Sequence, residues 1–398
     1  MNCIAKLVFA SLVGAGLFAG MNVQAAQKPA AASKPGKAAI ASSHQLATDA
    51  GLEILAKGGN AFDAAIAVGA ALAVVEPESS GLGGGGFFLL HRVKDGKDIF
   101  IDAREAAPAA SRSELWADAD GKLDSDKATN GPLSAGIPGE PAAYVWLAEH
   151  YGKLPLKASL APAIRIAREG FSVYSRLHRS IDRRSAVLSR WPASAQLYLV
   201  DGKAPEAGST WRNPDIANTL ERIARHGNDG FYRGEFASKL VDSVRASGGI
   251  WTLEDLDSYV VKERAPITLN YRGWKILTAP PPSSGGIVLG EMLNMLAGYD
   301  LAKLDQVHRV HLSVEAMRRA YRDRAEYLGD PDYVEMPINE LLSPLYAAGL
   351  RASIHPEKAT PSDLLPGYMP PGEPEHTTHY SIIDADGNMA SVTKTVNL

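Results

Sequence analysis

Cysteine is almost absent from this sequence: Cys3 is the only one among 398 residues. It lies in an N-terminal stretch that we interpret below as a leader. The mature chain is therefore expected to have no disulfide, no cysteine nucleophile and no cysteine metal site. A strong charge of either sign is also lacking, because 41 Lys and Arg stand against 45 Asp and Glu, for a net charge of -4. This balance gives no electrostatic basis for binding nucleic acid.

Long hydrophobic runs are scarce, and one of the few lies at the N-terminus. An apolar run over residues 7–19 follows the single cation Lys6, and Val23-Gln24-Ala25 resembles a small-residue cleavage site. The run is too short for a membrane span, so a membrane-anchoring helix is the less favoured alternative. The pattern predicts a signal peptide over residues 1–25, an exported (periplasmic or secreted) protein, and a mature chain without a membrane span. Residues 26–37, rich in Ala, Pro and Lys, predict a disordered lead-in.

A glycine-rich run occupies residues 81–86, where Gly81, Gly83 and Gly86 satisfy the G-x-G-x-x-G pattern. A dinucleotide site needs these glycines after a strand and before a helix. Here an apolar helix is predicted over 64–75 and a strand over 87–93, which is the reverse order. The pattern therefore does not predict nucleotide binding. Two interpretations stay open, namely a tight bend packed against the sheet or a backbone-lined wall of a small-molecule pocket.

Three groups of polar residues invite functional interpretations. Arg104 ends a predicted strand and could bind a carboxylate, or it could pair with Asp102 or Glu105. The basic run over 176–190 lacks interleaved aromatic residues and is interpreted as a solvated helical face. A long helix predicted over 308–327 carries a possible metal set, for which a structural helix with a charged outer face is the favoured alternative. The metal set is His308, His311 and Glu315, and the charged face is Arg318, Arg319, Arg322, Asp323 and Arg324.

The stretch around Thr377 is the most informative. A strand-like run over 380–383, an Asp-Gly turn at 386–387 and a second run over 389–397 predict a β-hairpin. A threonine at its mouth is ordinary in mid-chain. If the peptide bond before Thr377 is cut, however, its hydroxyl becomes a nucleophile and its new α-amine a general base. Helices and strands are mixed along the chain, which predicts an α/β (α+β) fold.

Taken together, these segments resemble the gamma-glutamyltransferase (glutathione hydrolase) family of the N-terminal-nucleophile hydrolases. The resemblance covers about residues 38 to 398 and rests on an ordered set of motifs: Gly58-Gly59-Asn60-Ala61-Phe62-Asp63-Ala64-Ala65, Val75-Glu76-Pro77, Ser80-Gly81-Leu82-Gly83-Gly84-Gly85-Gly86-Phe87, Asp102-Ala103-Arg104-Glu105, Gly136-Ile137-Pro138-Gly139, Pro280-Pro281-Pro282-Ser283-Ser284-Gly285-Gly286, Arg319-Ala320-Tyr321 and Thr377-Thr378-His379-Tyr380-Ser381.

The resemblance implies a four-layer αββα sandwich that is truncated at its C-terminal side. Residues 38–376 would form the large-subunit part, and residues 377–398 would begin an incomplete small subunit. It also implies self-cleavage between His376 and Thr377, with Thr377 as the nucleophile. Arg104 would hold the α-carboxylate of the donor, and Thr395 and Asn397 would belong to the same pocket, one assisting the nucleophile and the other contacting the substrate. Thr395 and Asn397 lie two apart on a predicted strand and so share a face.

The implied reaction is acyl transfer from a γ-glutamyl donor such as glutathione to water, an amino acid or a dipeptide. No metal or organic cofactor is implied. The expected partner is the missing small-subunit segment, without which we expect poor folding and little activity. A related acylase, acting on cephalosporin side chains or on poly-γ-glutamate, is one alternative. A truncated, non-catalytic relic is the other.

Overall fold

The computed structural model describes residues 35–365 and 377–396. The predicted signal peptide, most of the lead-in, and the two predicted site residues His376 and Asn397 lie outside the described residues. Within the described residues, no helix is long and apolar enough to cross a membrane.

A six-stranded sheet carries the fold, in the order β1-β9-β10-β2-β3-β6, with every neighbouring pair antiparallel. Two smaller sheets pair β4 with β5 and β7 with β8. The strands are β1 (Ala39–Ala41), β2 (Gly85–Arg92), β3 (Lys97–Ala103), β4 (Phe171–Ser172), β5 (Thr210–Trp211), β6 (Lys262–Arg264), β7 (Ile267–Tyr271), β8 (Trp274–Thr278), β9 (Thr377–Ile383) and β10 (Met389–Thr395).

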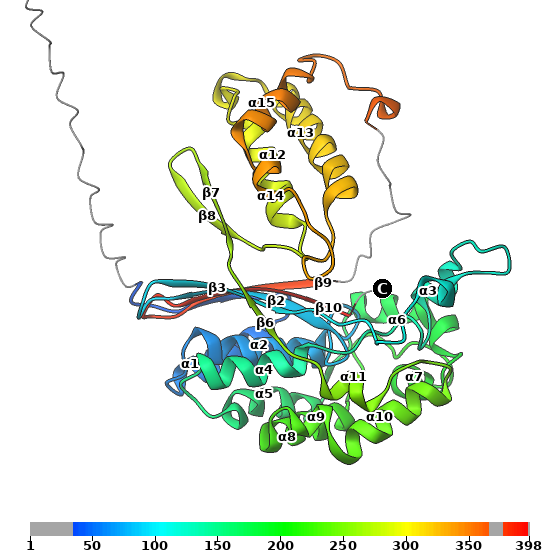
Figure 1. Ribbon diagram of the computed structural model, residues 1–398. Coiled ribbons are helices and arrows are strands. Elements are labelled where there is room, and N and C mark those ends of the chain that lie inside the picture. The colour runs from blue at the N-terminus through cyan, green and yellow to red at the C-terminus, as the bar shows by residue number, and fades with distance from the viewer. Residues whose placement is uncertain (1–34, 366–376, 397–398) are drawn as a thin grey trace, which may run out of the picture. The chain divides into compact units, whose positions relative to one another are not determined.

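The helices are α1 (Gln45–Ala56), α2 (Ala61–Val75), α3 (Ser125–Thr129), α4 (Glu140–His150), α5 (Leu156–Glu169), α6 (Ser175–Leu188), α7 (Pro192–Tyr198), α8 (Pro214–His226), α9 (Asp229–Tyr232), α10 (Gly234–Ala246), α11 (Leu253–Asp257), α12 (Gly285–Leu296), α13 (Gln306–Tyr327), α14 (Ile338–Leu341) and α15 (Pro344–Ala352). Figure 1 shows α1, α2 and α4 against one face of the six-stranded sheet, with α5 beneath these helices. The predicted mixture of helices and strands is therefore present.

Helix α2 is the centre of this helical layer, and every one of its residues is buried. Its sequence is apolar on all sides, which suits a helix that is surrounded by other elements. The helix begins at a capping box. The Asn60 side chain accepts from the backbone N–H of Asp63, at 3.0 Å, and the Asp63 carboxylate accepts from the N–H of Asn60, at 2.9 Å.

A second hydrophobic cluster joins α12, α13 and α15 and corrects one prediction. We expected Arg319 and Asp323 on a charged outer face of α13, but they are only 2% and 0% exposed. Arg319 pairs with the buried Glu315 at 2.6 Å, and Asp323 accepts from the Tyr346 hydroxyl at 2.8 Å. The prediction failed because α12 and α15 pack against this part of the helix, and buried charges persist only when paired or hydrogen-bonded.

The predicted hairpin is formed by β9 and β10, and its turn is held by Asp384. That carboxylate accepts from the backbone N–H groups of Asp386 and Asn388 and from the Asn388 side chain, at 2.8–3.0 Å. It also accepts from the N–H of Ala61, at 3.0 Å. One carboxylate thus shapes the turn and ties it to the first turn of α2.

Candidate active site

The ends of four neighbouring strands lie side by side at one end of the sheet, which is called the sheet edge below. Thr377 begins β9 and pairs with Thr395 near the end of β10, which in turn pairs with Gly85 at the start of β2. On the other side of β2, Gly86 pairs with Ala103, the last residue of β3, and Arg104 follows directly. Thr377, Thr395 and Arg104 therefore lie at the same edge, although more than 270 residues separate Arg104 from Thr377 in the sequence.

Both threonines point to the sheet face that is opposite the helical layer. Along β9 the burial alternates, with Thr377 and His379 exposed and Thr378 and Tyr380 buried. Along β10, Lys394 is buried and Thr395 is partly exposed. Since directly paired residues of antiparallel strands project from the same face, the side chains of Thr377 and Thr395 are neighbours.

The glycine-rich run packs directly against this edge. A Cβ on Gly84 would overlap the carbonyl oxygen of Thr395, and a Cβ on Gly85 would overlap that of Ala103. Gly83 has free space around it and lines two cavities. Both interpretations of the run are thus realised, because its later glycines allow close packing of strands and Gly83 forms cavity wall.

A buried ionic network lies beneath the threonine pair. Lys394 donates to the carbonyl of Gly69 at 2.6 Å, to the Tyr144 hydroxyl at 3.1 Å and to the Glu140 carboxylate. Lys394 and Glu140 are both 0% exposed. Burial raises the pKa of Glu140 and lowers that of Lys394, and the attraction between the two partners opposes both shifts. The network fixes the strand position next to Thr395.

The same network reaches the glycine run through the start of α4. The backbone N–H groups of Gly139 and Glu140 donate to the carbonyl of Gly84, at 2.9 and 3.1 Å. The segment that supplies Glu140 to Lys394 therefore also holds the glycine run against Thr395. Sequence reasoning did not identify Glu140 or Lys394, because a glutamate at a helix start and a lysine in a strand are ordinary surface residues.

The alternative prediction for Arg104 was a structural ion pair with Asp102 or Glu105, and the structure does not show such a pair among the described residues. The Asp102 carboxylate accepts instead from Arg264 Nε, at 2.8 Å. The Arg104 guanidinium has no hydrogen bond or ion pair to any residue that the structure describes, and its Cζ lies 5.7 Å from the centre of the Phe87 ring. Its backbone is fixed, since Tyr259 donates to its carbonyl at 2.8 Å. A fixed backbone with an available guanidinium suits recognition of an anion.

A cavity of about 680 Å³ is lined by Arg104, Gly83 and Val396, the residue after Thr395. Its far side is formed by α6 and the start of α7, including Arg184, Val187, Leu188 and Ser194. This volume lies in the usual range of small-molecule sites. Within the basic run that was predicted to form a solvated helical face, Arg184 is partly buried and lines this cavity.

His379 is a further polar residue on the exposed face and was missed as a candidate. Its ring nitrogens lie 2.8 Å from the Thr393 hydroxyl and 3.2 Å from the Ser381 hydroxyl. Burial lowers the pKa of His379, so the neutral ring is favoured at pH 7. The period of two along β9 places it on the Thr377 face, and this spacing was the signal that could have found it.

The metal interpretation of α13 finds no support in the geometry. His308 contacts Asp305 at 2.7 Å, His311 donates to the carbonyl of His355 at 2.7 Å, and Glu315 pairs with Arg319. The three side chains are thus engaged separately. Among the described residues, no group of three or more His, Cys, Asp or Glu is placed to hold a metal ion.

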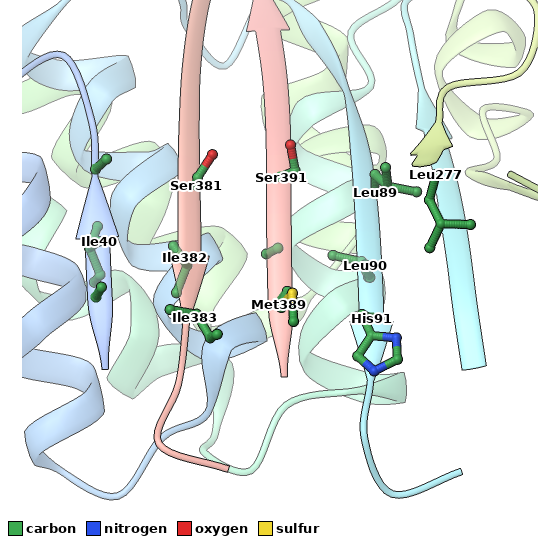
Figure 2. A pocket seen from close by; sticks show the side chains of 13 residues that line it. Ile40, Leu89, Leu90, His91, Leu277, Ser381, Ile382, Ile383, Met389 and Ser391 are labelled. Atoms are coloured by element: carbon green, nitrogen blue, oxygen red, sulfur yellow. The ribbon is translucent and has the colours of Figure 1, made fainter. Parts of the chain in front are cut away.

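The exposed face of the sheet also holds a hollow of about 490 Å³. Figure 2 shows Ser381, Ser391 and Leu89 projecting there from β9, β10 and β2. His91 is the only titratable residue among its lining residues that the structure describes. This hollow therefore offers little chemistry, and the threonine edge with Arg104 is the better candidate site.

Comparison with known proteins identifies the family of this chain. The family model described as Gamma-glutamyltranspeptidase matches residues 47–398. A glutathione hydrolase proenzyme of Pseudomonas sp. (strain A14) is 40% identical over 395 residues, which cover 98% of this chain and 68% of that protein. The first four curated relatives are matched over 62% to 68% of their own lengths.

Two solved structures resemble this fold closely. Helicobacter pylori gamma-glutamyltranspeptidase has a TM-score of 0.79 and 36% identity, covering 82% of this chain and 94% of that chain. The cephalosporin acylase of Bacillus halodurans also has a TM-score of 0.79, with 34% identity, covering 90% of this chain and 66% of that chain. These matches place the fold among the N-terminal-nucleophile hydrolases, as predicted. The chain belongs to the gamma-glutamyltranspeptidase family.

Proposed function

We propose that this chain acts on γ-glutamyl amides such as glutathione, with Thr377 as an N-terminal nucleophile. The observation that carries the proposal is the meeting of Thr377, Thr395 and the available Arg104 guanidinium at one sheet edge. Arg104 would bind the α-carboxylate of the donor and orient its γ-carbonyl. His376 and Asn397 keep their predicted roles as cleavage-site and substrate-contact residues.

The proposed reaction begins with cleavage of the peptide bond between His376 and Thr377, which frees the α-amine of Thr377. Its Oγ then attacks the γ-carbonyl carbon while the α-amine takes the hydroxyl proton. The C–N bond of the amide breaks, and the leaving amine receives that proton. Water, an amino acid or a dipeptide next attacks the resulting ester, which releases glutamate or a new γ-glutamyl product. The proposal requires no metal or organic cofactor.

Self-cleavage provides the first test. The purified chain should give a new N-terminus at Thr377 in intact-mass and N-terminal analysis, and Thr377→Ala should abolish it. Thr393→Ala is the matched control, since it removes a hydroxyl from the same sheet face two residues from Thr395. Normal processing and turnover by Thr377→Ala would refute the proposed nucleophile.

We also propose that turnover needs a companion segment equivalent to the remaining part of the longer relatives, and that the protein is exported through residues 1–25. The need for a companion segment is tested by measuring γ-glutamyl anilide hydrolysis by residues 1–398 with and without the C-terminal part of a relative. Equal, undiminished hydrolysis by the chain alone would contradict it. Cell fractionation with and without residues 1–25 tests export.

An acylase is the second candidate, because a cephalosporin acylase matches this fold as well as a gamma-glutamyltranspeptidase does. The Arg104 guanidinium favours the γ-glutamyl substrate, which carries a free α-carboxylate. A glutaryl anilide has the same side-chain carbonyl but lacks the α-carboxylate and α-amine. Preference for the γ-glutamyl over the glutaryl anilide, lost in Arg104→Ala, is the expected result, and preference for the glutaryl compound would favour the acylase.

A further inference from the structure

The cavity beside Arg104 holds a second cation. Among its described lining residues the charged ones are Arg104, Glu105 and Arg184. The two arginines come from different elements, one after β3 and the other from α6. Two cations against one carboxylate make this cavity electrostatically suited to a ligand with more than one negative charge.

Arg184 is held at the cavity wall without being neutralised by a paired carboxylate. Its guanidinium donates to the side-chain oxygen of Asn130, which also lines the cavity. The charge of Asp126 also interacts with Arg184, but the Asp126 carboxylate is paired with Arg190 at 2.8 Å. A guanidinium has five N–H donors, so one bond to an amide leaves others for a ligand.

Part of the wall around Arg184 is apolar. Val187 and Leu188 line the cavity from the i+3 and i+4 positions of α6, which share a face with Arg184, and Trp191 lines it from the connection to α7. Trp191 packs so closely on Gly131 that a Cβ there would lie 2.9 Å from its ring. The wall therefore presents one cation beside an uncharged, partly aromatic surface.

We propose that Arg184 binds the carboxylate at the far end of a γ-glutamyl peptide, in the group that leaves after the amide is cut. This inference rests on the proposed function, which places the donor's α-carboxylate on Arg104. A γ-glutamyl peptide carries a second carboxylate at its C-terminus, on the other side of the scissile amide. The uncharged side chain between them would lie against Val187, Leu188 and Trp191. Arg184 would thus favour peptide leaving groups, which carry a carboxylate, over amine leaving groups that lack one.

The direct probe is the leaving group itself, because its binding needs no catalysis. S-methyl-cysteinylglycine and its C-terminal amide, which lacks the carboxylate, are titrated by calorimetry into the purified chain together with the companion segment proposed above. The chain should bind the acid more tightly than the amide by about tenfold, the scale of one charge-assisted hydrogen bond. Arg184→Ala should abolish this preference and leave the amide's affinity unchanged, and Arg184→Lys should restore part of it.

Two controls separate this inference from the proposed function. Asn130→Ala removes the partner of Arg184 but keeps the cation, so the preference for the acid should largely remain. With the companion segment present, Arg104→Ala should weaken γ-glutamyl anilide turnover without changing the acid-to-amide preference of the dipeptide. If the unmodified chain does not discriminate the acid from the amide, binds neither, or keeps its preference in Arg184→Ala, the subsite assignment is overturned. Failure of Thr377 processing would instead count against the proposed function alone.

Discussion

At the scale of single residues, the buried charges of this protein differ in how they are satisfied. Glu315 is 1% exposed but accepts hydrogen bonds from Thr360, Arg319 and Arg318, which outweigh burial and lower its pKa to about 2. Glu291 on α12 is also 1% exposed, yet neither of its carboxylate oxygens has a hydrogen-bond partner among the described residues. Burial, reinforced by the nearby Asp323, raises the pKa of Glu291 to about 9.

This difference predicts that Glu291 lowers the free energy of unfolding in a pH-dependent way. Its pKa is 4.5 in the reference state, so between about pH 4.5 and 9 the unfolded chain releases a proton that the folded chain retains. Stability contributed by the protonated group is therefore complete below pH 4.5 and lost as pH rises through this window. Glu291→Gln should raise the free energy of unfolding at pH 8 by about 1–3 kcal/mol and leave it unchanged at pH 4.

Urea unfolding at pH 4 and pH 8 measures the effect. Glu335→Gln is the matched control, since Glu335 is exposed in the loop after α13. If the free energy of unfolding changes with pH in the same way in Glu291→Gln and in the unmodified chain, Glu291 is already ionised in the folded state at pH 8.

At the scale of elements, the β9–β10 hairpin carries both threonines of the candidate site, and its position depends on its turn. Asp384 is 5% exposed and links the turn to the start of α2. Asp386, two residues on, has an exposed side chain that lies 3.4 Å from Lys153. Replacing each aspartate by alanine therefore compares the loss of a buried carboxylate with the loss of an exposed one.

We predict that Asp384→Ala lowers the free energy of unfolding by about 2–4 kcal/mol, because four donors lose a charged acceptor. Asp386→Ala should cost less than about 1 kcal/mol, as expected for an exposed ion pair. Denaturant unfolding of both variants provides the measurement. Equal effects of the two substitutions would mean that Asp384 does not anchor the hairpin.

At the scale of the whole molecule, the Lys394–Glu140 pair connects the sheet to the helical layer. Lys394 lies on β10, Glu140 begins α4, and the Gly69 carbonyl that Lys394 also contacts lies in the middle of α2. Three elements from distant parts of the sequence thus meet in one buried network below Thr395. The candidate site is positioned by this network as well as by the strand register.

Removing one partner of this pair should be costly. We predict that Lys394→Met lowers the free energy of unfolding by about 3–5 kcal/mol, because it leaves the buried Glu140 without its cation. The double variant Lys394→Met with Glu140→Gln should recover part of that loss, since no buried charge is then left uncompensated. Thermal and denaturant unfolding of the two singles and the double give the coupling energy, and additive effects would contradict the buried ion pair.

Local sequence patterns predicted much of the fold. The helix expected over 64–75 lies within α2 (Ala61–Val75), the helix expected over 308–327 within α13 (Gln306–Tyr327), and the 389–397 run corresponds to β10 with a slightly earlier end. These features act within a few residues, through capping, periodicity and turn chemistry. Thr377, Thr395 and Arg104 were also predicted as site residues, but from an ordered set of family motifs and not from local pattern.

What the sequence by itself determined is therefore the type and extent of its regular elements and the residues that match the family's site. Only the tertiary structure decided that Lys394 is buried against Glu140, that Gly84 packs on Thr395, and that Arg184 shares a cavity with Arg104. The physical reason is distance along the chain. Caps and periodicities are satisfied by near neighbours, whereas these contacts join segments about 80 to 310 residues apart and leave no trace in either segment alone.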